Sequence, residues 1–417
     1  MSNRSVTFVG LGYIGLPTAV IMANHGLDVH GFDINTRAVN AINRGELTIV
    51  EPGLKEQLRQ ALDSGCFRAS TEPRHSDTFV LAVPTPCTET KEGDLSYIFS
   101  AGEKIAPLLR GGELIILEST SPPQTTQKLA QYILSLRPDL CADGAPNPQG
   151  LPVIYFAHCP ERILPGRALE ELVTNDRIIG GQSPRAVERA CELYRTFCTG
   201  ELLETDDVTA ELAKLTENSF RDVNIAFANE LSLIAETLGV DVWKLIELAN
   251  HHPRVNILQP GPGVGGHCIA VDPWFIVSSD PKNSPLIRTA REVNDRKPQW
   301  VIEQVHAAVA CVDSARIAVL GLSFKADIDD LRESAALKIA QQLAHELPGV
   351  SLAVVEPHIS ELPSVLRDYP QVHLASLEDA LEEANIVLLL VDHQAFSSVP
   401  ACALAGKEVI DTKGFWR

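Results

Sequence analysis

The strongest constraint on the fold lies at residues 6–33, where a short apolar strand pattern runs into three glycines and then into a helix pattern. The segment "VTFVGLGYIGLP" places Gly10, Gly12 and Gly15 in a Gly-x-Gly-x-x-Gly spacing. The first glycine permits a tight turn, the second leaves space beside the backbone, and the third lets the helix approach the strand. Asp33 ends the next strand pattern, "LDVHGFD". This order of elements predicts a Rossmann-type α/β unit.

The same segment predicts a dinucleotide site. The start of a helix offers unpaired N–H groups to phosphates. Asp33 would accept hydrogen bonds from a ribose hydroxyl and repel a 2′-phosphate, so NAD is expected rather than NADP. The strands that end in "AVPTP" and "ESTSPPQTT" place Thr85, Thr120 and Thr126 at the ligand side of the sheet, as contacts of cofactor or substrate. Helix capping is the alternative role for these hydroxyl groups.

Strand and helix patterns alternate in both halves of the chain. In the first 180 residues, short apolar runs are separated by helix-length segments, which predicts a doubly wound parallel sheet. The alternation returns from residue 315, and "IAVLGLS" resembles "VTFVGLG" near the start. Glu356 ends a strand pattern there, as Asp33 does in the first half. We therefore expect two Rossmann-like domains, residues 1–205 and 306–417.

The sequence pattern predicts that the middle of the chain, residues 206–305, is helical. From about residue 206 to Gly239 there is no proline and no internal glycine, and apolar residues recur at three- and four-residue spacings. This pattern predicts one long helix that ends at Gly239. A helix that is apolar on much of its circumference needs cover on more than one side, so a homodimer is expected.

Composition excludes some classes of partner. A net charge of −19 argues against nucleic acid, because phosphate backbones are bound by clustered Lys and Arg. The most apolar run, "IVLLLV", is too short to span a membrane, and the first residues show no signal-peptide pattern. Nine cysteines without a CxxC pair indicate free thiols in a reducing compartment. A soluble cytoplasmic protein is the expectation.

One cysteine stands out by its context. Cys268 follows the glycine-rich "PGPGVGGH", and Asp272 comes four residues later. A partly exposed thiolate is a good nucleophile, and Asp272 could orient a lysine or act on water. The alternative is a buried structural cysteine.

A metal site is a further alternative for this region, and it is disfavoured. The nearby candidates are His251, His252, His267 and Cys268. Two of them are adjacent and precede a proline, and no second thiol pair exists, which does not match a common ligand spacing. We expect no metal.

Lys214, Asn218 and Arg221 fall at i, i+4 and i+7 in the predicted long helix, so they share one face. A helix face with two cations and an amide could bind an anionic substrate. The alternative is that these three side chains are only solvated. Together with NAD and Cys268, these residues suggest oxidation of an alcohol to an acid through a cysteine thiohemiacetal and thioester. In that chemistry Lys214 is the base and Asn218 the oxyanion donor.

Several motifs resemble the UDP-glucose/GDP-mannose 6-dehydrogenase family over nearly the whole chain. The matching segments are "GLGYIGLP", "VPTP", "EST", "CPERILPG", "AKLTENSFRDVNIAFANE", "GPGVGGHCIAVDP" and "GLSFKADIDDLRES". The resemblance implies an NAD-binding Rossmann domain (1–205), a central helical dimerisation and catalytic domain (206–305) and a UDP-sugar-binding Rossmann-like domain (306–417).

The resemblance also implies roles for individual residues. The nucleophile is Cys268, the acid/base is Lys214, the oxyanion donor is Asn218, and the residues that support water and proton transfer are Asp272, Glu161 and Thr120. The contacts of NAD are Gly10, Gly12, Tyr13, Ile14, Gly15, Asp33, Thr85, Thr126 and, from the third domain, Arg332. The residues that hold the nucleotide sugar are Arg162, Ile163, Lys214, Asn218, Arg221, Phe324, Lys325 and Lys413.

Two longer segments, "KLTENSFRDVNIAFANELSLI" and "HHPRVNILQPGPGVGGHCIAVDPWFIV", resemble one branch of the family. That branch oxidises UDP-N-acetyl-D-mannosamine at C6 for bacterial surface polysaccharides of the enterobacterial common antigen type. In that branch the residues matching His252, Arg254 and Gly265 contact the substrate, and Arg254 comes from the partner subunit. The alternatives are a UDP-N-acetylglucosamine or UDP-glucose 6-dehydrogenase, a two-electron 3-hydroxyacid dehydrogenase, and a nucleotide-sugar or NAD-binding module without catalysis.

Overall fold

The computed structural model describes residues 5–47, 49, 51–163, 166–266 and 268–416. The chain divides into two compact units. The first comprises Met1–Thr216 and Trp274–Ser279, and the second comprises Glu217–Pro273 and Asp280–Arg417.

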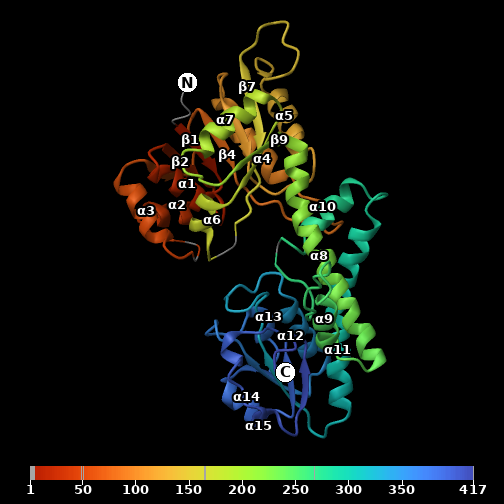
Figure 1. Cartoon of the computed structure of the whole chain (residues 1–417). Coiled ribbons are helices and arrows are strands. Elements are labelled where there is room, and N and C mark those ends of the chain that lie inside the picture. The colour runs from red at the N-terminus through yellow and green to blue at the C-terminus, as the bar shows by residue number, and fades with distance from the viewer. Residues whose placement is uncertain (1–4, 48, 50, 164–165, 267, 417) are drawn as a thin grey trace. The chain divides into compact units, whose positions relative to one another are not determined.

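A nine-stranded sheet organises the first unit, and its main path runs in the order β3-β2-β1-β4-β5-β7-β8-β9, with β6 beside β7 (Figure 1). The strands are β1 (Ser5–Val9), β2 (Asp28–Phe32), β3 (Phe67–Ser70), β4 (Thr78–Leu81), β5 (Leu114–Leu117), β6 (Cys141–Ala142), β7 (Val153–His158), β8 (Arg177–Gly181) and β9 (Leu202–Asp206). All neighbouring pairs are parallel except β7 and β8, which are antiparallel. The sheet is thus doubly wound with one reversed strand pairing.

Helices cover both faces of this sheet. They are α1 (Gly15–Asn24), α2 (Thr36–Asn43), α3 (Leu54–Asp63), α4 (Ser96–Ile105), α5 (Thr125–Leu136), α6 (Ala168–Thr174) and α7 (Pro184–Tyr194), with a 3-10 turn, η1, at Ala106–Leu108. A further short helix, α10 (Asp272–Ser279), begins in the second unit and continues into the first along the chain.

Strand β5 shows how the core is divided. Leu114 and Ile116 join the cluster on one face, with α1, α3 and α7, and Ile115 and Leu117 join the cluster on the other, with α4 and α5. Alternate residues point to opposite faces of a strand, so both faces of the sheet are buried.

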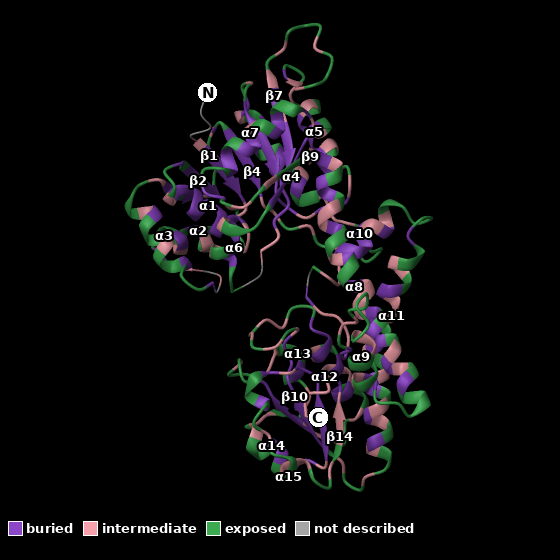
Figure 2. Ribbon diagram, in the orientation of Figure 1, coloured by how far each residue is buried: buried purple, intermediate pink, exposed green. Residues whose placement is uncertain are grey.

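The second unit contains long helices and a five-stranded parallel sheet in the order β12-β11-β10-β13-β14. The strands are β10 (Arg316–Leu320), β11 (Ser351–Val355), β12 (Val372–Leu374), β13 (Ile386–Leu389) and β14 (Glu408–Asp411). The helices are α9 (Val242–Asn250), α11 (Pro285–Ala310), α12 (Ala335–Glu346), α13 (Ser364–Arg367), α14 (Leu377–Glu383), α15 (Ala401–Leu404) and the 3-10 turn η2 (Gln394–Phe396). The central strands of this sheet are buried, as in the first unit (Figure 2).

The predicted long helix is α8 (Asp207–Leu238), which has 32 residues. It ends where expected, because Gly239 has a φ of +66°, a conformation that glycine adopts without strain. Among the described residues, no helix has both the length and the apolar character that crossing a lipid bilayer requires.

Candidate functional site

The glycine turn after β1 has the form that a dinucleotide requires. Gly10 has a φ of +97°, and a Cβ built on Gly15 would lie 2.0 Å from the Gly10 carbonyl oxygen, so both positions need glycine for the fold itself. A Cβ built on Gly12, in contrast, would meet no atom within 4 Å. Packing therefore does not explain Gly12, whereas a ligand that approaches the backbone at the start of α1 does.

Asp33 is held in place at the end of β2. Its Oδ2 accepts the backbone N–H of Leu11 at 2.9 Å, and its Oδ1 accepts that of Asn35 at 2.8 Å. The carboxylate is thereby tied to the glycine turn and remains half-buried. The cradle at Gly12 and the fixed acid beside it fit NAD, which Gly10, Gly12, Gly15 and Asp33 would hold.

Other predicted cofactor contacts have structural partners of their own. The Thr85 hydroxyl donates to the Thr120 carbonyl oxygen. The hydroxyl and backbone N–H of Thr126 both donate to Glu211 Oε1 at 2.7 Å, and Tyr13 donates its hydroxyl to Glu51 at 2.9 Å.

The acidic residue that binds Thr126 was not found from the sequence. Glu211 lies on α8 and also accepts the Gln124 N–H, so it caps the start of α5. Burial raises the pKa of Glu211 to about 7. Its only sequence signal is its place one helical turn before Lys214, which is insufficient to identify it.

Glu161 takes part in a buried ion pair. Its Oε2 lies 2.9 Å from Nη1 of Arg177 on β8, and its Oε1 accepts the Arg162 backbone N–H at 2.7 Å. Glu118, which follows β5, accepts a hydrogen bond from the Tyr194 hydroxyl at 2.6 Å. Burial, followed by the charge of Glu161, raises the pKa of Glu118 to about 7. The buried ion pair of Glu161 and Arg177, together with the hydrogen bond from the Arg162 N–H, holds the backbone of the segment that carries Arg162 and Ile163. Catalytic use of Glu161 remains a prediction.

A cavity of about 520 Å³ lies within the second unit. Its size is that of a small-molecule site. Five of the predicted substrate-binding residues line it, and they come from α8, the glycine-rich loop, the loop after β10 and the end of β14: Arg221, Gly265, Phe324, Lys325 and Lys413. The sequence thus selected residues that the fold brings together from positions almost 200 apart.

The glycine-rich loop packs tightly on one wall of this cavity. A Cβ on Gly265 would lie 2.8 Å from the Phe324 Cβ, and a Cβ on Gly266 would lie 3.2 Å from the Phe324 ring. These glycines are needed for the approach of Phe324, a reason that the sequence pattern did not reveal.

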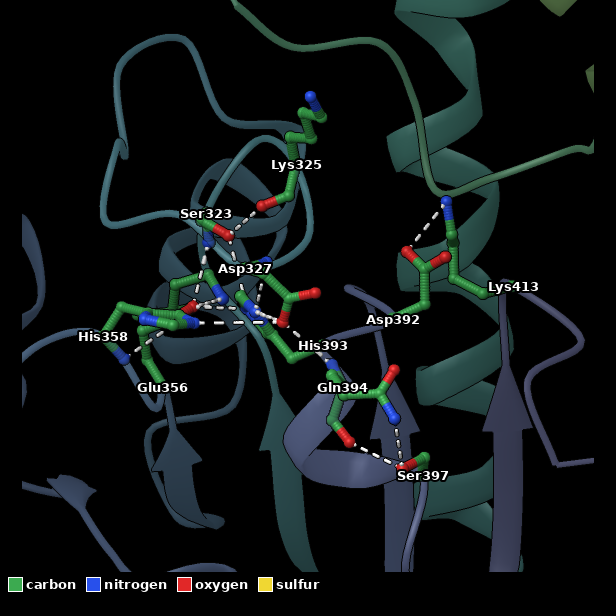
Figure 3. Close-up of polar contacts among 11 residues, drawn as sticks. Ser323, Lys325, Asp327, Glu356, His358, Asp392, His393, Gln394, Ser397 and Lys413 are labelled. Atoms are coloured by element: carbon green, nitrogen blue, oxygen red, sulfur yellow. Dashed lines mark hydrogen bonds and ion pairs between the residues drawn. The ribbon is translucent and has the colours of Figure 1, made fainter. Parts of the chain in front are cut away.

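Cationic groups face the cavity. Lys413 Nζ lies 3.2 Å from Asp392 Oδ1, and the two side chains point toward each other (Figure 3). Asp392 was not predicted. Lys325 is exposed, and its side chain is directed away from the neighbouring acidic and histidine residues (Figure 3). Arg221 adds a third positive charge to the lining.

Cys268 is exposed, and it lies in the turn that precedes α10. The backbone N–H of Asp272 donates to the Cys268 carbonyl oxygen at 2.8 Å, so the thiol and the acid are held by one turn. The Asp272 carboxylate accepts from Asn218 Nδ2 at 2.5 Å. Three predicted catalytic residues are thus linked within the second unit, and Lys214 lies four residues before Asn218 along α8.

Three other predicted binding residues do not line this cavity. His252 and Arg254 are exposed just after α9, and the Arg254 N–H donates to His252 Nδ1 at 3.3 Å. Arg332 forms an ion pair with Asp330 at 2.6 Å. Their roles toward a partner subunit and the cofactor stay predictions. His267, one of the metal ligands considered above, lies outside the described residues.

One cluster in the C-terminal sheet could suggest a metal site. Asp327, His358 and His393 place one ligand atom each within 4.8 Å of the others, next to Glu356 (Figure 3). However, His393 Nδ1 accepts the Asp327 N–H at 2.9 Å, so its other nitrogen carries the proton and donates to Glu356 at 3.1 Å. Both ring nitrogens of His393 are therefore engaged, and the cluster fastens the loop that carries Phe324 to the end of β13.

Replacing Lys413 by alanine is expected to raise the KM for the nucleotide sugar predicted from the sequence about 10- to 100-fold with a smaller change in kcat, because a charge-assisted contact with a phosphate contributes about 1.5–3 kcal/mol. Steady-state kinetics on purified protein would measure this. Lys244→Ala, on the exposed surface of α9, is the matched control. An unchanged KM in Lys413→Ala would remove this lysine from substrate binding.

Comparison with known proteins agrees with this geometry. Family models of the UDP-glucose/GDP-mannose dehydrogenase family match residues 4–198 (NAD binding domain), 208–296 (central domain) and 318–417 (UDP binding domain). The three models together account for most of the chain.

Individual relatives are similar over their full length. The UDP-N-acetyl-D-mannosamine dehydrogenase of Escherichia coli is 52% identical over 425 residues, covering 100% of both chains. The NDP-N-acetyl-D-galactosaminuronic acid dehydrogenase of Ralstonia nicotianae is 54% identical over 414 residues, covering 99% of this chain and 96% of the relative. Among solved structures, a UDP-N-acetyl-mannosamine dehydrogenase from S. aureus superposes with a TM-score of 0.86 at 42% identity, covering 99% of this chain and 95% of that one.

Proposed function

This chain belongs to the UDP-glucose/GDP-mannose dehydrogenase family, and from that premise we propose that it oxidises C6 of UDP-N-acetyl-D-mannosamine to the uronate. It is an NAD-dependent nucleotide-sugar dehydrogenase. The observation that carries the choice of site is the cavity of the second unit, because Gly265 and Ile269, on either side of Cys268 in the chain, both line it.

The reaction converts R–CH₂OH, two NAD⁺ and one water into R–COO⁻, two NADH and three protons. NAD, when bound, accepts a hydride from the carbon that is oxidised. The first oxidation yields an aldehyde, to which the Cys268 thiolate adds, forming a C–S bond and a thiohemiacetal. The second oxidation of this adduct yields a thioester. Water then breaks the C–S bond and releases the carboxylate together with the thiolate.

The neighbouring side chains have distinct roles in this proposal. Lys214 removes the hydroxyl proton of the substrate, and Asn218 donates hydrogen bonds to the oxyanion that forms at C6. Asp272 holds the Asn218 amide in the described structure at 2.5 Å, and it orients the water that attacks the thioester. Thr120 and Glu161 are proposed to support water and proton transfer.

The nucleotide part of the substrate binds the cationic wall of the cavity. A UDP-sugar carries two negative charges on its diphosphate, and the cavity lining has three cationic residues, Arg221, Lys325 and Lys413, against one acidic residue, Asp392. Lys413 is kept in place by Asp392, so its contact with a phosphate requires little rearrangement. Phe324, which packs on the glycine-rich loop, supplies an apolar surface beside these charges.

A second candidate differs only in the sugar. The relative from Ralstonia nicotianae, at 54% identity, is named for N-acetyl-D-galactosaminuronic acid, so a galacto-configured substrate has specific support. A panel of UDP-N-acetyl-mannosamine, -glucosamine and -galactosamine with NAD, followed by absorbance and by product mass, would separate the two. Oxidation of the manno sugar at the highest kcat/KM supports the proposal. Preference for another sugar would reassign the substrate, and no NADH from any of them would point to a binding module.

The homodimer is also part of this proposal. Along α8, Phe220, Phe227 and Ile234 are spaced by seven residues and are exposed by 69%, 53% and 48%. Residues at this spacing share one helix face, and three large apolar side chains on an exposed face are characteristic of an association surface. A second copy of the same helix is the partner that this face fits.

Phe227→Asp should convert the dimer to a monomer, since it buries a charge at the centre of the apolar face. Sedimentation velocity over a range of concentrations would measure the change. Val365→Asp replaces an exposed apolar residue on α13 and serves as control. A dimer that persists in Phe227→Asp, or is lost equally in both variants, would contradict the assignment of this face.

A further inference from the structure

Four fully buried polar side chains connect α8 to α11. Asp222 and Asn229 are two turns apart on α8, and Arg291 and Asn294 are one turn apart on α11. Each has no exposed surface. We call these four residues the polar seam. Buried polar groups are costly unless they are satisfied, and apolar residues of similar size would pack two helices equally well. Their presence therefore needs a reason beyond stability.

The seam forms a continuous chain of hydrogen bonds. Asn229 Nδ2 donates to Asn294 Oδ1 at 2.8 Å, and Asn294 Nδ2 donates to Asp222 Oδ1, also at 2.8 Å. Asp222 Oδ1 in turn accepts from the Arg291 guanidinium. Arg291 also pairs with Asp295 at 2.9 Å, which fixes the remainder of its guanidinium.

Both ends of this chain bind the loop that carries the catalytic cysteine. Asn229 Oδ1 accepts the backbone N–H of Gly261 at 2.9 Å, and Arg291 Nη1 donates to the carbonyl oxygen of Ile269 at 3.4 Å. Gly261 precedes Cys268 by seven residues, and Ile269 follows it directly. The seam therefore binds the loop at one point before Cys268 and at one point after it.

The direction of every hydrogen bond in the chain is fixed. The Gly261 N–H can only donate and the Asp222 carboxylate can only accept, so the two asparagines between them have one permitted amide orientation each. A network with a single arrangement fixes the two backbone groups of the loop that it binds, the Gly261 N–H and the Ile269 carbonyl oxygen. Such a restriction matters most for a nucleophile in a glycine-rich segment, because glycine allows the backbone more conformations than other residues do.

We infer that the polar seam of Asp222, Asn229, Arg291 and Asn294 positions Cys268 for attack on the substrate carbon. These are positioning residues, since they act through the loop and do not touch the sugar. The inference rests on the proposed function for its catalytic consequence. The order that the seam imposes on the loop is a separate property that can be measured without substrate or NAD.

The test compares Asn294→Leu with a matched control in the same pair of helices. Leucine has the same branched skeleton of heavy atoms as asparagine, with bulkier methyl groups, and it breaks the chain at its centre. Ser232→Ala removes a buried hydroxyl that accepts a hydrogen bond from Lys297 Nζ on α11 at 2.7 Å and donates one to the Asn229 backbone carbonyl within α8. These contacts involve no side chain of the seam and no residue of the loop. The melting temperatures of both variants are measured. The control shows how a loss of stability alone affects the readouts below.

The first readout is the rate at which iodoacetamide alkylates Cys268 in the substrate-free protein, followed by peptide mass. Cys311 and Cys402 are exposed and serve as internal references. We expect Asn294→Leu to change the Cys268 rate at least about fivefold relative to these references, and Ser232→Ala to leave the ratio unchanged. The second readout is steady-state kinetics, where Asn294→Leu should lower kcat about 10- to 100-fold with little change in KM, the effect of displacing a reacting group by about 1 Å.

An unchanged alkylation ratio and a kcat within twofold of the control would overturn the inference and leave the seam a purely structural contact. Asn229→Ala, which cuts the chain at its Gly261 end, replaces Asn294→Leu if that variant does not fold. A wild-type protein that oxidises no UDP-sugar would contradict the proposed function, whereas the alkylation ratio would still decide whether the seam orders the loop.

Discussion

Cys268→Ser is expected to lower formation of the uronate at least about 10³-fold while NAD still binds, since loss of a covalent nucleophile removes the main route to the acid. Serine retains the shape of the side chain, but its hydroxyl is not ionised near neutral pH and is a much weaker nucleophile than a thiolate. The reaction should stall at or before the thioester stage. Mass analysis of single-turnover mixtures would show whether an aldehyde or ester accumulates.

The control for this variant is Cys311→Ser, which alters an exposed cysteine at the end of α11. It should retain wild-type activity. NAD binding to Cys268→Ser, measured by titration, separates loss of chemistry from loss of the cofactor site. Uronate formation at the wild-type rate by Cys268→Ser would show that the acid forms without a covalent adduct at this position.

Lys214→Ala should lower kcat about 10²–10⁴-fold, the range for loss of an acid/base group. The side chain is half-buried on α8, one turn before Asn218, so the substitution removes the amine without opening the core. A concentrated exogenous amine should restore part of the rate, because it can replace the missing base in the space left by the side chain.

Lys128→Ala, on the exposed surface of α5, is the control for removal of a lysine. It should leave kcat and KM unchanged. If Lys214→Ala had the wild-type rate across the pH range, another group would have to take the substrate proton, and Lys214 would be left with a role in binding only.

The elements with strong periodic patterns were predictable. The 32-residue α8 has no internal glycine or proline, and its start and end agree with the expectation within one residue. The apolar runs before the glycine turn, before Asp33, before "AVPTP" and before "ESTSPPQTT" are β1, β2, β4 and β5. Strand β9 was missed because its residues are mostly polar and exposed, and β12 because it has three residues. The antiparallel pairing of β7 with β8 was not predicted, since an apolar run does not reveal the direction of its neighbour.

The site could be predicted in part. Cys268, Arg221, Lys325 and Lys413 have local signals or a family motif, and the last three line one cavity with Gly265. Asp222 and Asn294 have none, because they are single polar residues in helices and resemble solvent-facing positions. The two residues are hydrogen-bonded to each other but lie 72 residues apart in the chain. Only the packing of α8 on α11 reveals that both are buried.

The central claim is a four-electron oxidation by a single site, and the number of NADH molecules formed per UDP-N-acetyl-D-mannosamine consumed tests it most directly. With limiting sugar and excess NAD, the absorbance change and the mass of the product give both quantities from one reaction. The account predicts two NADH per sugar and a carboxylate product without free aldehyde. One NADH per sugar, with the aldehyde as the final product, would contradict it.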